Sequence, residues 1–192
     1  SLEVLQALKG RHPELRVLAL QRPSGQSRAV HSGVKAARAA WVATLDGDGQ
    51  NDPADILTLL QARQHADARV KLLAGWRVKR QDSGPRRWAS RAANAIRVRL
   101  LHDNTPDTGC GIKLFERAAF LALPYFDHMH RYLPALMQRD GWATRSVPVN
   151  HRARSSGQSK YTNIGRALVG VRDLLGVCWL IARARPTAER EL

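Results

Sequence analysis

The chain has 192 residues, enough for one α/β domain with its own core, and its 44% hydrophobic content excludes a disordered chain. Lysine and arginine number 31 against 16 aspartate and glutamate residues, so the net charge of +15 favours polyanionic partners such as nucleic acid, anionic lipid or phosphorylated substrates. Cys110 and Cys178 lack metal-ligand spacing and predict no disulfide framework, and no run reaches the roughly 18 apolar residues that a membrane span needs.

Helical and extended patterns alternate through the first half of the chain. The predicted elements are, in order, a helix at residues 2–9, a strand at 16–20, a helix at 27–40, a strand at 41–45, a helix at 54–65 and a strand at 70–75. Because strands that alternate with helices are joined by right-handed crossovers, this order predicts an α/β fold with a mostly parallel sheet.

The second half is more basic and less regular. The predicted elements are a basic loop at residues 77–85, a helix at 86–101, a loop at 104–111, a strand at 112–115, a helical turn at 117–123, a helix at 132–140, a strand at 144–149, a basic Ser/Gly-rich loop at 151–161 and a long helix at 163–185. We therefore expect a main domain at residues 1–161 and a C-terminal helix and tail at residues 162–192.

The long C-terminal helix contains an apolar run, Leu174–Ala182, that is too short to span a membrane. Arg172, Arg183 and Arg185 flank this run, and Trp179 is a side chain that favours membrane–water interfaces. This pattern predicts an amphipathic helix that lies in the membrane interface. A helix that packs on the core of the protein is the alternative.

The clearest chemical signal follows the strand at residues 41–45. Asp46 and Asp48 stand at its carboxyl end with one glycine between them, Gln50 follows, and Asn51-Asp52-Pro53 is typical of a helix start. Ligands of α/β sheets bind at the carboxyl ends of strands, and carboxylate and amide oxygens suit Mg²⁺ or Mn²⁺. The stretch predicts a cation site that holds a nucleoside diphosphate. An acidic turn that only caps a helix is the alternative.

Several short segments, in this order along the chain, carry a resemblance to a known family. They are Gly25-Gln26-Ser27, residues 46–53, Gly75-Trp76-Arg77, residues 86–94, Asp107-Thr108-Gly109-Cys110, residues 130–136 (His-Arg-Tyr-Leu-Pro-Ala-Leu) and residues 152–161. Together they resemble the inverting family 2 glycosyltransferases, in the branch that transfers sugars to dolichyl phosphate and polyprenyl phosphate.

The resemblance implies a Rossmann-like nucleotide-diphospho-sugar transferase fold of GT-A type. It implies an enzyme that moves a sugar from a nucleotide sugar, GDP-mannose or a UDP-sugar, to a polyprenyl phosphate. The expected partners are therefore these two substrates and an anionic membrane surface, with no nucleic acid. The expected location is the cytoplasm, peripheral on the inner face of the cell membrane.

Residue by residue, the resemblance implies that Asp48 and Gln50 are the ligands of a Mg²⁺ or Mn²⁺ cofactor. It implies that Asp46 faces the nucleotide sugar. Asp46, Asp48 and Arg77 are therefore the candidate catalytic residues.

Basic side chains of the resembling segments are expected to bind phosphate. Arg77, Arg86 and Ser90 match groups that hold the acceptor and donor phosphates, and Arg152 and Lys160 match a basic loop that closes over the site. Arginine offers planar, bidentate contacts to phosphate, and lysine a point charge. A lipid phosphate is largely ionised at neutral pH, so the attack needs cations that position it rather than a strong general base.

The start of the chain departs from the family pattern. Members of the family open with a strand, a short Asn-Glu motif and a second acidic strand end, which bind the base and the ribose of the nucleotide. This chain shows none of these and begins inside the helix that follows the second strand. We therefore expect an N-terminally truncated version of the fold, either as a piece of a longer protein or as a truncated gene product.

Two other functions compete with the glycosyltransferase. A basic module that binds nucleic acid would explain the net charge, although the chain has no RNA-recognition or zinc-finger signature. A nucleotidyltransferase would also use metal-binding carboxylates, but it would release pyrophosphate rather than a nucleoside diphosphate.

Overall fold

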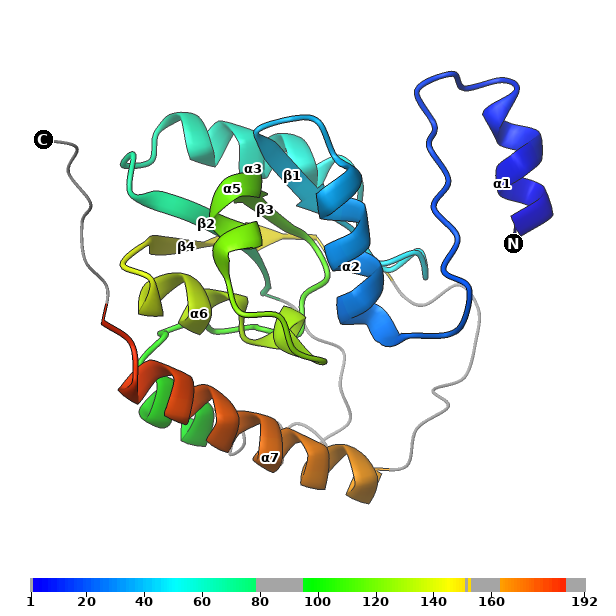
Figure 1. Ribbon diagram of the computed structural model, residues 1–192. Helices are drawn as coiled ribbons and strands as arrows, with labels where there is room; N and C mark the ends of the chain where they lie inside the picture. The colour runs from blue at the N-terminus through cyan, green and yellow to red at the C-terminus, as the bar shows by residue number, and fades with distance from the viewer. Residues whose placement is uncertain (1, 79–94, 151, 153–162, 186–192) are drawn as a thin grey trace, which may run out of the picture.

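The computed structural model describes residues 2–78, 95–150, 152 and 163–185, which form a four-stranded sheet with helices on both faces (Figure 1). The strands, in the spatial order β1-β3-β2-β4, are β1 (Trp41–Thr44), β3 (Lys113–Glu116), β2 (Val70–Arg77) and β4 (Ala143–Val149).

Three of the four strands share one direction. β2 and β4 are parallel, whereas β3 pairs antiparallel with both β1 and β2. β1, β2 and β4 therefore run the same way, as the strand–helix alternation predicts. The sheet as a whole is mixed, because β3 is inserted between β1 and β2.

Alternate side chains of the central strands face opposite layers of helices. On one face, Leu72 and Phe115 pack with residues of α2 (Gly25–Ala36), α5 (Arg117–Ala122), α6 (Leu133–Arg139) and α7 (Asn163–Ala182). On the other face, Leu73 and Leu114 pack with Leu59 of α3 (Asp55–Gln64). Each fully buried leucine or phenylalanine contributes about 1.5–3 kcal/mol relative to an exposed position, so the two layers hold the sheet from both sides.

The prediction of a strand at residues 16–20 is wrong. This segment is extended but pairs with no described strand, and Leu18 is 54% exposed. Arg16 instead donates from Nη1 to the carbonyl oxygen of Ala36, at 2.6 Å. A run of apolar residues becomes a strand only when a neighbouring strand supplies hydrogen-bond partners, and the described residues place none beside it. The helix before it, α1 (Leu2–Lys9), buries no side chain.

Most predicted helices are confirmed within a few residues. α2 is shorter than predicted, because Ala37 leaves the helix with extended backbone angles, φ −64° and ψ 147°. Of the helix predicted at residues 86–101, the structure describes residues 95–101, and these are helical. A short 3₁₀ helix, η1 (Met129–Arg131), precedes α6 and was not predicted.

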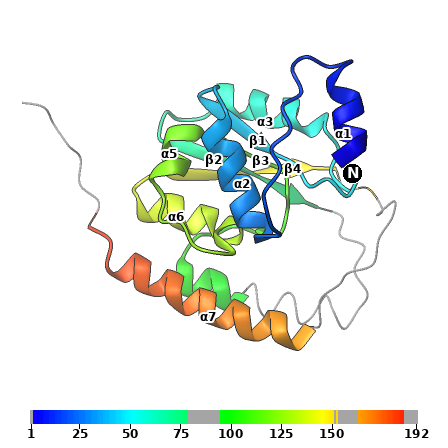
Figure 2. The same ribbon diagram turned by 45° about the vertical axis from the view of Figure 1, so that its right-hand side comes forward.

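α7 packs along one side of the molecule, beside the helix at residues 95–101 (Figures 1 and 2). Val177 is completely buried in the core. The Tyr132 hydroxyl donates to the carbonyl oxygen of Gly170 at 3.2 Å, and Arg139 Nε donates to that of Leu180 at 3.1 Å. One side of α7 is therefore part of the core, as the alternative interpretation held.

The other side of α7 is exposed and apolar. Val171, Leu175 and Trp179 follow one another at intervals of four residues, and each is more than half exposed (58%, 64% and 61%). Among the described residues, no helix combines the length and apolarity needed to cross a membrane. Contact of this face with a membrane surface stays a prediction.

Candidate functional site

The acidic turn after β1 is shaped by its own polar side chains. The backbone N–H of Asp46 donates to Oδ1 of Asn51 at 3.1 Å, and Asn51 is buried. The backbone N–H of Gln50 donates to Oδ1 of Asp48 at 3.2 Å. Gly49, with φ +77°, takes the left-handed conformation that glycine adopts without strain. The turn therefore presents both carboxylates at the end of the strand.

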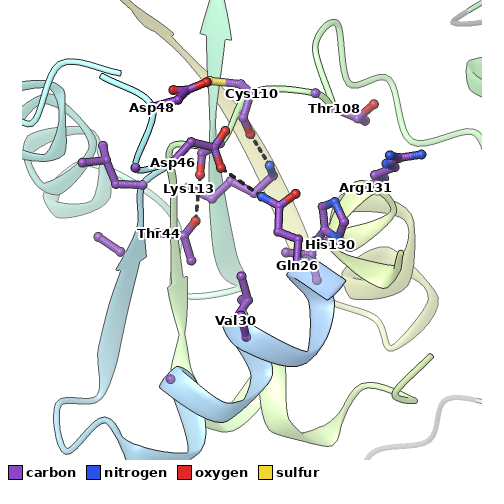
Figure 3. Close-up of a pocket in the computed structure, with 18 of the residues that line it drawn as sticks. Gln26, Val30, Thr44, Asp46, Asp48, Thr108, Cys110, Lys113, His130 and Arg131 are labelled. Carbon is purple, nitrogen blue, oxygen red and sulfur yellow. Dashed lines mark hydrogen bonds between the residues drawn. The ribbon is translucent and has the colours of Figure 1, made fainter. Parts of the chain in front are cut away.

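Asp46 is also held from outside the turn. Gln26, in the first turn of α2, donates from Nε2 to Oδ1 of Asp46 at 2.9 Å (Figure 3). Gly111 lies against the other carboxylate oxygen, because an added Cβ there would stand 2.1 Å from Oδ2 of Asp46. The carbonyl oxygen of Gly111 in turn accepts a hydrogen bond from Thr44 Oγ1, at 2.9 Å. Asp46 is thus oriented by α2 and by the 107–111 loop together.

The segment after β4 is attached to the same turn. The backbone N–H of Arg152 donates to the carbonyl oxygen of Gln50 at 3.0 Å, and its Nη2 donates to Asp52 Oδ2 at 2.5 Å. The buried Asp55 accepts from the backbone and side-chain nitrogens of Asn150, at 2.8 and 3.0 Å. Arg152 therefore lies at the predicted cation site, with its guanidinium paired to Asp52.

Arg77, at the end of β2, is oriented by Asp107. Nε and Nη2 of Arg77 donate to Oδ2 and Oδ1 of Asp107 at 2.6 and 2.8 Å, a bidentate pair. Asp107 is almost fully buried, so the carboxylate that holds the Arg77 side chain is itself fixed in the protein interior. This geometry shows that Asp107 orients the guanidinium of Arg77.

Lys113 was not singled out from the sequence. It is buried in β3, and its Nζ donates to the carbonyl oxygen of Cys110 (Figure 3). Burial lowers the pKa of Lys113, while Cys110, Asp46 and Asp107 oppose that shift. A lysine inside an otherwise apolar strand, Ile112 to Phe115, was the signal that could have found it.

Several of these residues line a cleft of about 1010 Å³. Asp46, Asp48, Gln50 and Arg77 all line it, so the structure brings together four of the predicted site residues. Arg86, Ser90 and Lys160 lie outside the described residues. The remaining lining includes Gln26, Thr108, Cys110, Lys113, His130 and Arg131.

The donor set fits a metal that is shared with a nucleotide. Among the described residues, no three His, Cys, Asp or Glu side chains form a group that could hold a metal by themselves. Mg²⁺, however, is usually bound by one or two carboxylates, with phosphate oxygens and water completing its shell. In the acidic turn, Asp48 carries one such carboxylate and Gln50 adds an amide oxygen, so both fit a site of this kind.

The first 123 residues match the family model described as glycosyl transferase family 2. The chain belongs to glycosyltransferase family 2. It is 35% identical over 182 residues to a dodecaprenyl-phosphate galacturonate synthase of Rhizobium johnstonii. The matched region covers 90% of this chain and 51% of the relative. It is 33% identical over 163 residues to an undecaprenyl-phosphate 4-deoxy-4-formamido-L-arabinose transferase of Edwardsiella ictaluri, over 84% of this chain and 49% of that one. The chain thus spans about half the length of the curated relatives that it matches.

Solved structures of another enzyme share the fold. Glucosyl-3-phosphoglycerate synthase from Mycobacterium tuberculosis, in complex with UDP, aligns with a TM-score of 0.59 at 16% identity, over 89% of this chain and 59% of that one. Its complex with Mn²⁺, UDP-glucose and phosphoglyceric acid aligns with a TM-score of 0.57, over 94% and 60% of the two chains. Together with the family match, this likeness confirms the predicted nucleotide-diphospho-sugar transferase fold of GT-A type.

Proposed function

We propose that this family 2 chain transfers a sugar from a nucleotide sugar to a polyprenyl phosphate, with the help of a divalent metal ion. The observation that carries the proposal is the acidic turn, whose Asp46 and Asp48 line the cleft. Gln26 and Gly111 orient Asp46 within it. Both relatives described above are, by name, transferases or synthases of polyprenyl-phosphate sugars.

Asp48 and Gln50 would hold the metal, Mg²⁺ or Mn²⁺. When bound, the metal supplies positive charge that stabilises the departing nucleoside diphosphate. Asp46 is held by hydrogen bonding and close packing, so it is in place to contact the donor before the donor arrives. The likeness to a structure that contains Mn²⁺ and UDP-glucose supports this assignment.

Cations on the other walls of the cleft would position the acceptor. Arg77 lines the cleft in an orientation that Asp107 maintains, and its guanidinium would contact a phosphate there. Arg152, which lies beside the acidic turn and outside the cleft lining, would contribute by exchanging its contact with Asp52 for one with phosphate. Arg86, Ser90 and Lys160 complete the proposed set from outside the described residues.

The exposed side of α7 would bring the enzyme to its lipid substrate. Val171, Leu175 and Trp179 suit the headgroup boundary of a bilayer, and Arg172 and Arg183 suit its anionic phosphates. We assign this contact to the inner, cytoplasmic face of the cell membrane, with residues 162–192 as the interfacial segment.

Calorimetry with UDP and GDP, with and without Mn²⁺, tests the donor site. We expect Mn²⁺ to strengthen binding at least tenfold in the wild type, and Asp48→Asn to abolish that gain. Asp67→Asn, at an exposed surface turn, is the matched control. An unchanged Mn²⁺ effect in Asp48→Asn would contradict the assignment.

Product analysis separates the proposal from the competing functions. A transferase incubated with a nucleotide sugar and a short-chain polyprenyl phosphate releases a nucleoside diphosphate and forms a lipid-linked sugar. Release of pyrophosphate would indicate a nucleotidyltransferase instead. Salt-sensitive binding of random oligonucleotides without nucleotide-sugar binding would indicate a nucleic-acid module.

A further inference from the structure

His130 and Arg131 line the cleft but have no part in the function proposed above. Both belong to η1, and Figure 3 shows them on the side of the cleft away from Asp48. They are part of the His-Arg-Tyr-Leu-Pro-Ala-Leu segment of the sequence. Their surroundings indicate what they bind.

The ring of His130 is held by a buried serine. Nδ1 lies 2.7 Å from Oγ of Ser27, which is 1% exposed, and the same Oγ accepts the backbone N–H of His130 at 3.4 Å. Burial, followed by the charges of Arg131 and Lys113, lowers the pKa of His130 to about 4. The ring is therefore neutral at pH 7. Because Oγ of Ser27 already accepts the backbone N–H of His130, we infer that the serine hydroxyl donates to Nδ1, which fixes the Nε2–H tautomer. Nε2 carries the remaining ring proton and can donate it to a ligand.

Arg131 offers its guanidinium to the same cleft. Within the described part of the chain, its side chain makes no hydrogen bond and no ion pair. Two other arginines in the described part of the chain differ, because Arg77 is paired with Asp107 and Arg152 with Asp52. A partly buried guanidinium next to a neutral N–H donor is an arrangement that suits an oxyanion.

One helical turn sets the position of this pair relative to the acidic turn. Gln26 and Ser27 are consecutive residues in the first turn of α2. Gln26 bonds to Asp46, and Ser27 bonds to His130. The two carboxylates of the acidic turn would repel an anion from their side of the cleft, whereas His130 and Arg131 would attract it to theirs.

We propose that His130 and Arg131 form a second substrate subsite, which binds an oxyanion through the guanidinium and the Nε2–H group. The oxyanion is either a carboxylate on the transferred sugar, as in a uronosyl donor, or the phosphate of the lipid acceptor. This inference rests on the proposed function, because it takes one of that reaction's two substrates as the ligand. His130 and Arg131 act in it as positioning residues.

A pair of donors that differ in one group tests whether the oxyanion is a carboxylate on the transferred sugar. UDP-glucuronate and UDP-glucose differ only in carrying a carboxylate or a hydroxymethyl group. If the subsite binds the sugar carboxylate, calorimetry in the presence of Mn²⁺ shows that the wild type binds UDP-glucuronate more tightly than UDP-glucose. Arg131→Gln then reduces this ratio of affinities by roughly tenfold to a hundredfold. Binding of UDP itself stays unchanged. Arg145→Gln, on the exposed side of β4, is the matched loss of charge outside the cleft.

Farnesyl phosphate and farnesol test whether the oxyanion is the phosphate of the lipid acceptor. If the subsite holds the acceptor phosphate, Arg131→Gln weakens the binding of farnesyl phosphate by a similar factor and leaves the binding of farnesol unchanged. The preference between the two donors then stays as in the wild type. In either experiment, His130→Gln retains more affinity for the anionic ligand than His130→Ala, because the amide nitrogen of glutamine replaces the Nε2–H donor. If Arg131→Gln changes neither the donor preference nor farnesyl phosphate binding, the subsite is overturned.

A measurement without nucleotide separates the subsite from the proposed function. Long-range ¹H–¹⁵N NMR of the histidine rings should show His130 as the Nε2–H tautomer, and added inorganic phosphate should shift its signals in the wild type but not in Arg131→Gln. If UDP does not bind while phosphate still shifts His130, the proposed function fails, and His130 and Arg131 remain an oxyanion site without an assigned substrate. If UDP binds with Mn²⁺ but phosphate leaves His130 unmoved and Arg131→Gln has no effect, the subsite alone is wrong.

Discussion

At the scale of single residues, the two carboxylates of the acidic turn are held differently. Asp48 accepts from the backbone of its own turn, a contact that depends only on local sequence. Asp46 depends on Gln26, twenty residues earlier, and on the space beside Gly111, sixty-five residues later. Substitutions at either of these two distant positions should therefore disturb Asp46.

Gly111→Ala tests this dependence. The new Cβ would stand 2.1 Å from Oδ2 of Asp46, so the carboxylate must move or the loop must shift. We expect a loss of about 1–3 kcal/mol in the free energy of unfolding, measured by urea denaturation, and weaker Mn²⁺-dependent UDP binding. Gly47→Ala, where no atom lies within 4 Å of the added Cβ, is the matched control. Equal effects of the two substitutions would show that the close approach to Asp46 is unimportant.

The partly buried His130 should make stability depend on pH. Its pKa is about 4 in the folded chain against 6.5 for an unperturbed histidine, so the unfolded chain binds more protons between these values. Stability from this group is present above pH 6.5 and is lost as the pH falls towards 4, by at most about 3 kcal/mol.

Urea denaturation at pH 7 and at about pH 5 measures this loss. Since other groups also titrate in that range, the informative quantity is the difference between the wild type and His130→Gln, which removes the titrating group. We expect the variant to lose less stability on acidification, whereas His65→Gln on the surface should follow the wild type. Identical pH dependence in all three proteins would show that His130 does not titrate as described.

At the scale of elements, α7 has two apolar sides with different surroundings. Val177 faces the core, where Leu174 and Ile181 pack nearby. Leu175 and Trp179 face solvent. The apolar run seen in the sequence therefore contains both the core contact and the exposed face, and a helix with this double pattern does not have to leave the core to meet a membrane.

Leu175→Gln combined with Trp179→Gln tests the exposed face. Both side chains are more than half exposed, so we expect stability to change by less than about 0.5 kcal/mol. Co-sedimentation with vesicles that contain anionic lipid should fall several-fold, because the buried apolar area is lost. Leu57→Gln, a 63% exposed leucine on α3, controls for loss of surface hydrophobicity. If all three proteins sediment equally, α7 does not contact the membrane.

At the scale of the whole molecule, the net charge of +15 adds an attraction that no single residue carries. Exposed charges are screened within about 10 Å at 0.1 M salt, whereas apolar contact is not weakened by salt. Added salt should therefore separate the electrostatic component of vesicle binding from the apolar component.

We expect wild-type vesicle binding to weaken between roughly 0.05 and 0.5 M salt and then to level off at a hydrophobic remainder. The double variant of Leu175 and Trp179 should keep the salt-sensitive component and lose the remainder. Binding that salt abolishes completely in the wild type would indicate a purely electrostatic contact, and the exposed face of α7 would then have another use.

Local patterns in the sequence were sufficient for much of this protein. Helical spacing located α1, α3 and α6, and the carboxylates after an apolar run located the acidic turn, because these features depend on residues a few positions apart. The order of the motifs identified the family, which the comparison confirmed. Asp46, Asp48, Gln50 and Arg77 indeed line one cleft.

Only the tertiary structure decided what depends on distant pairing. It inserted β3 antiparallel between β1 and β2, and it left the apolar segment at residues 16–20 without a strand partner among the described residues. It paired Ser27 with His130, which are 103 residues apart, and buried Lys113 beneath the cleft. Periodicity tells which side of an element is apolar but not which element covers it, because that choice is made by packing the whole chain at once.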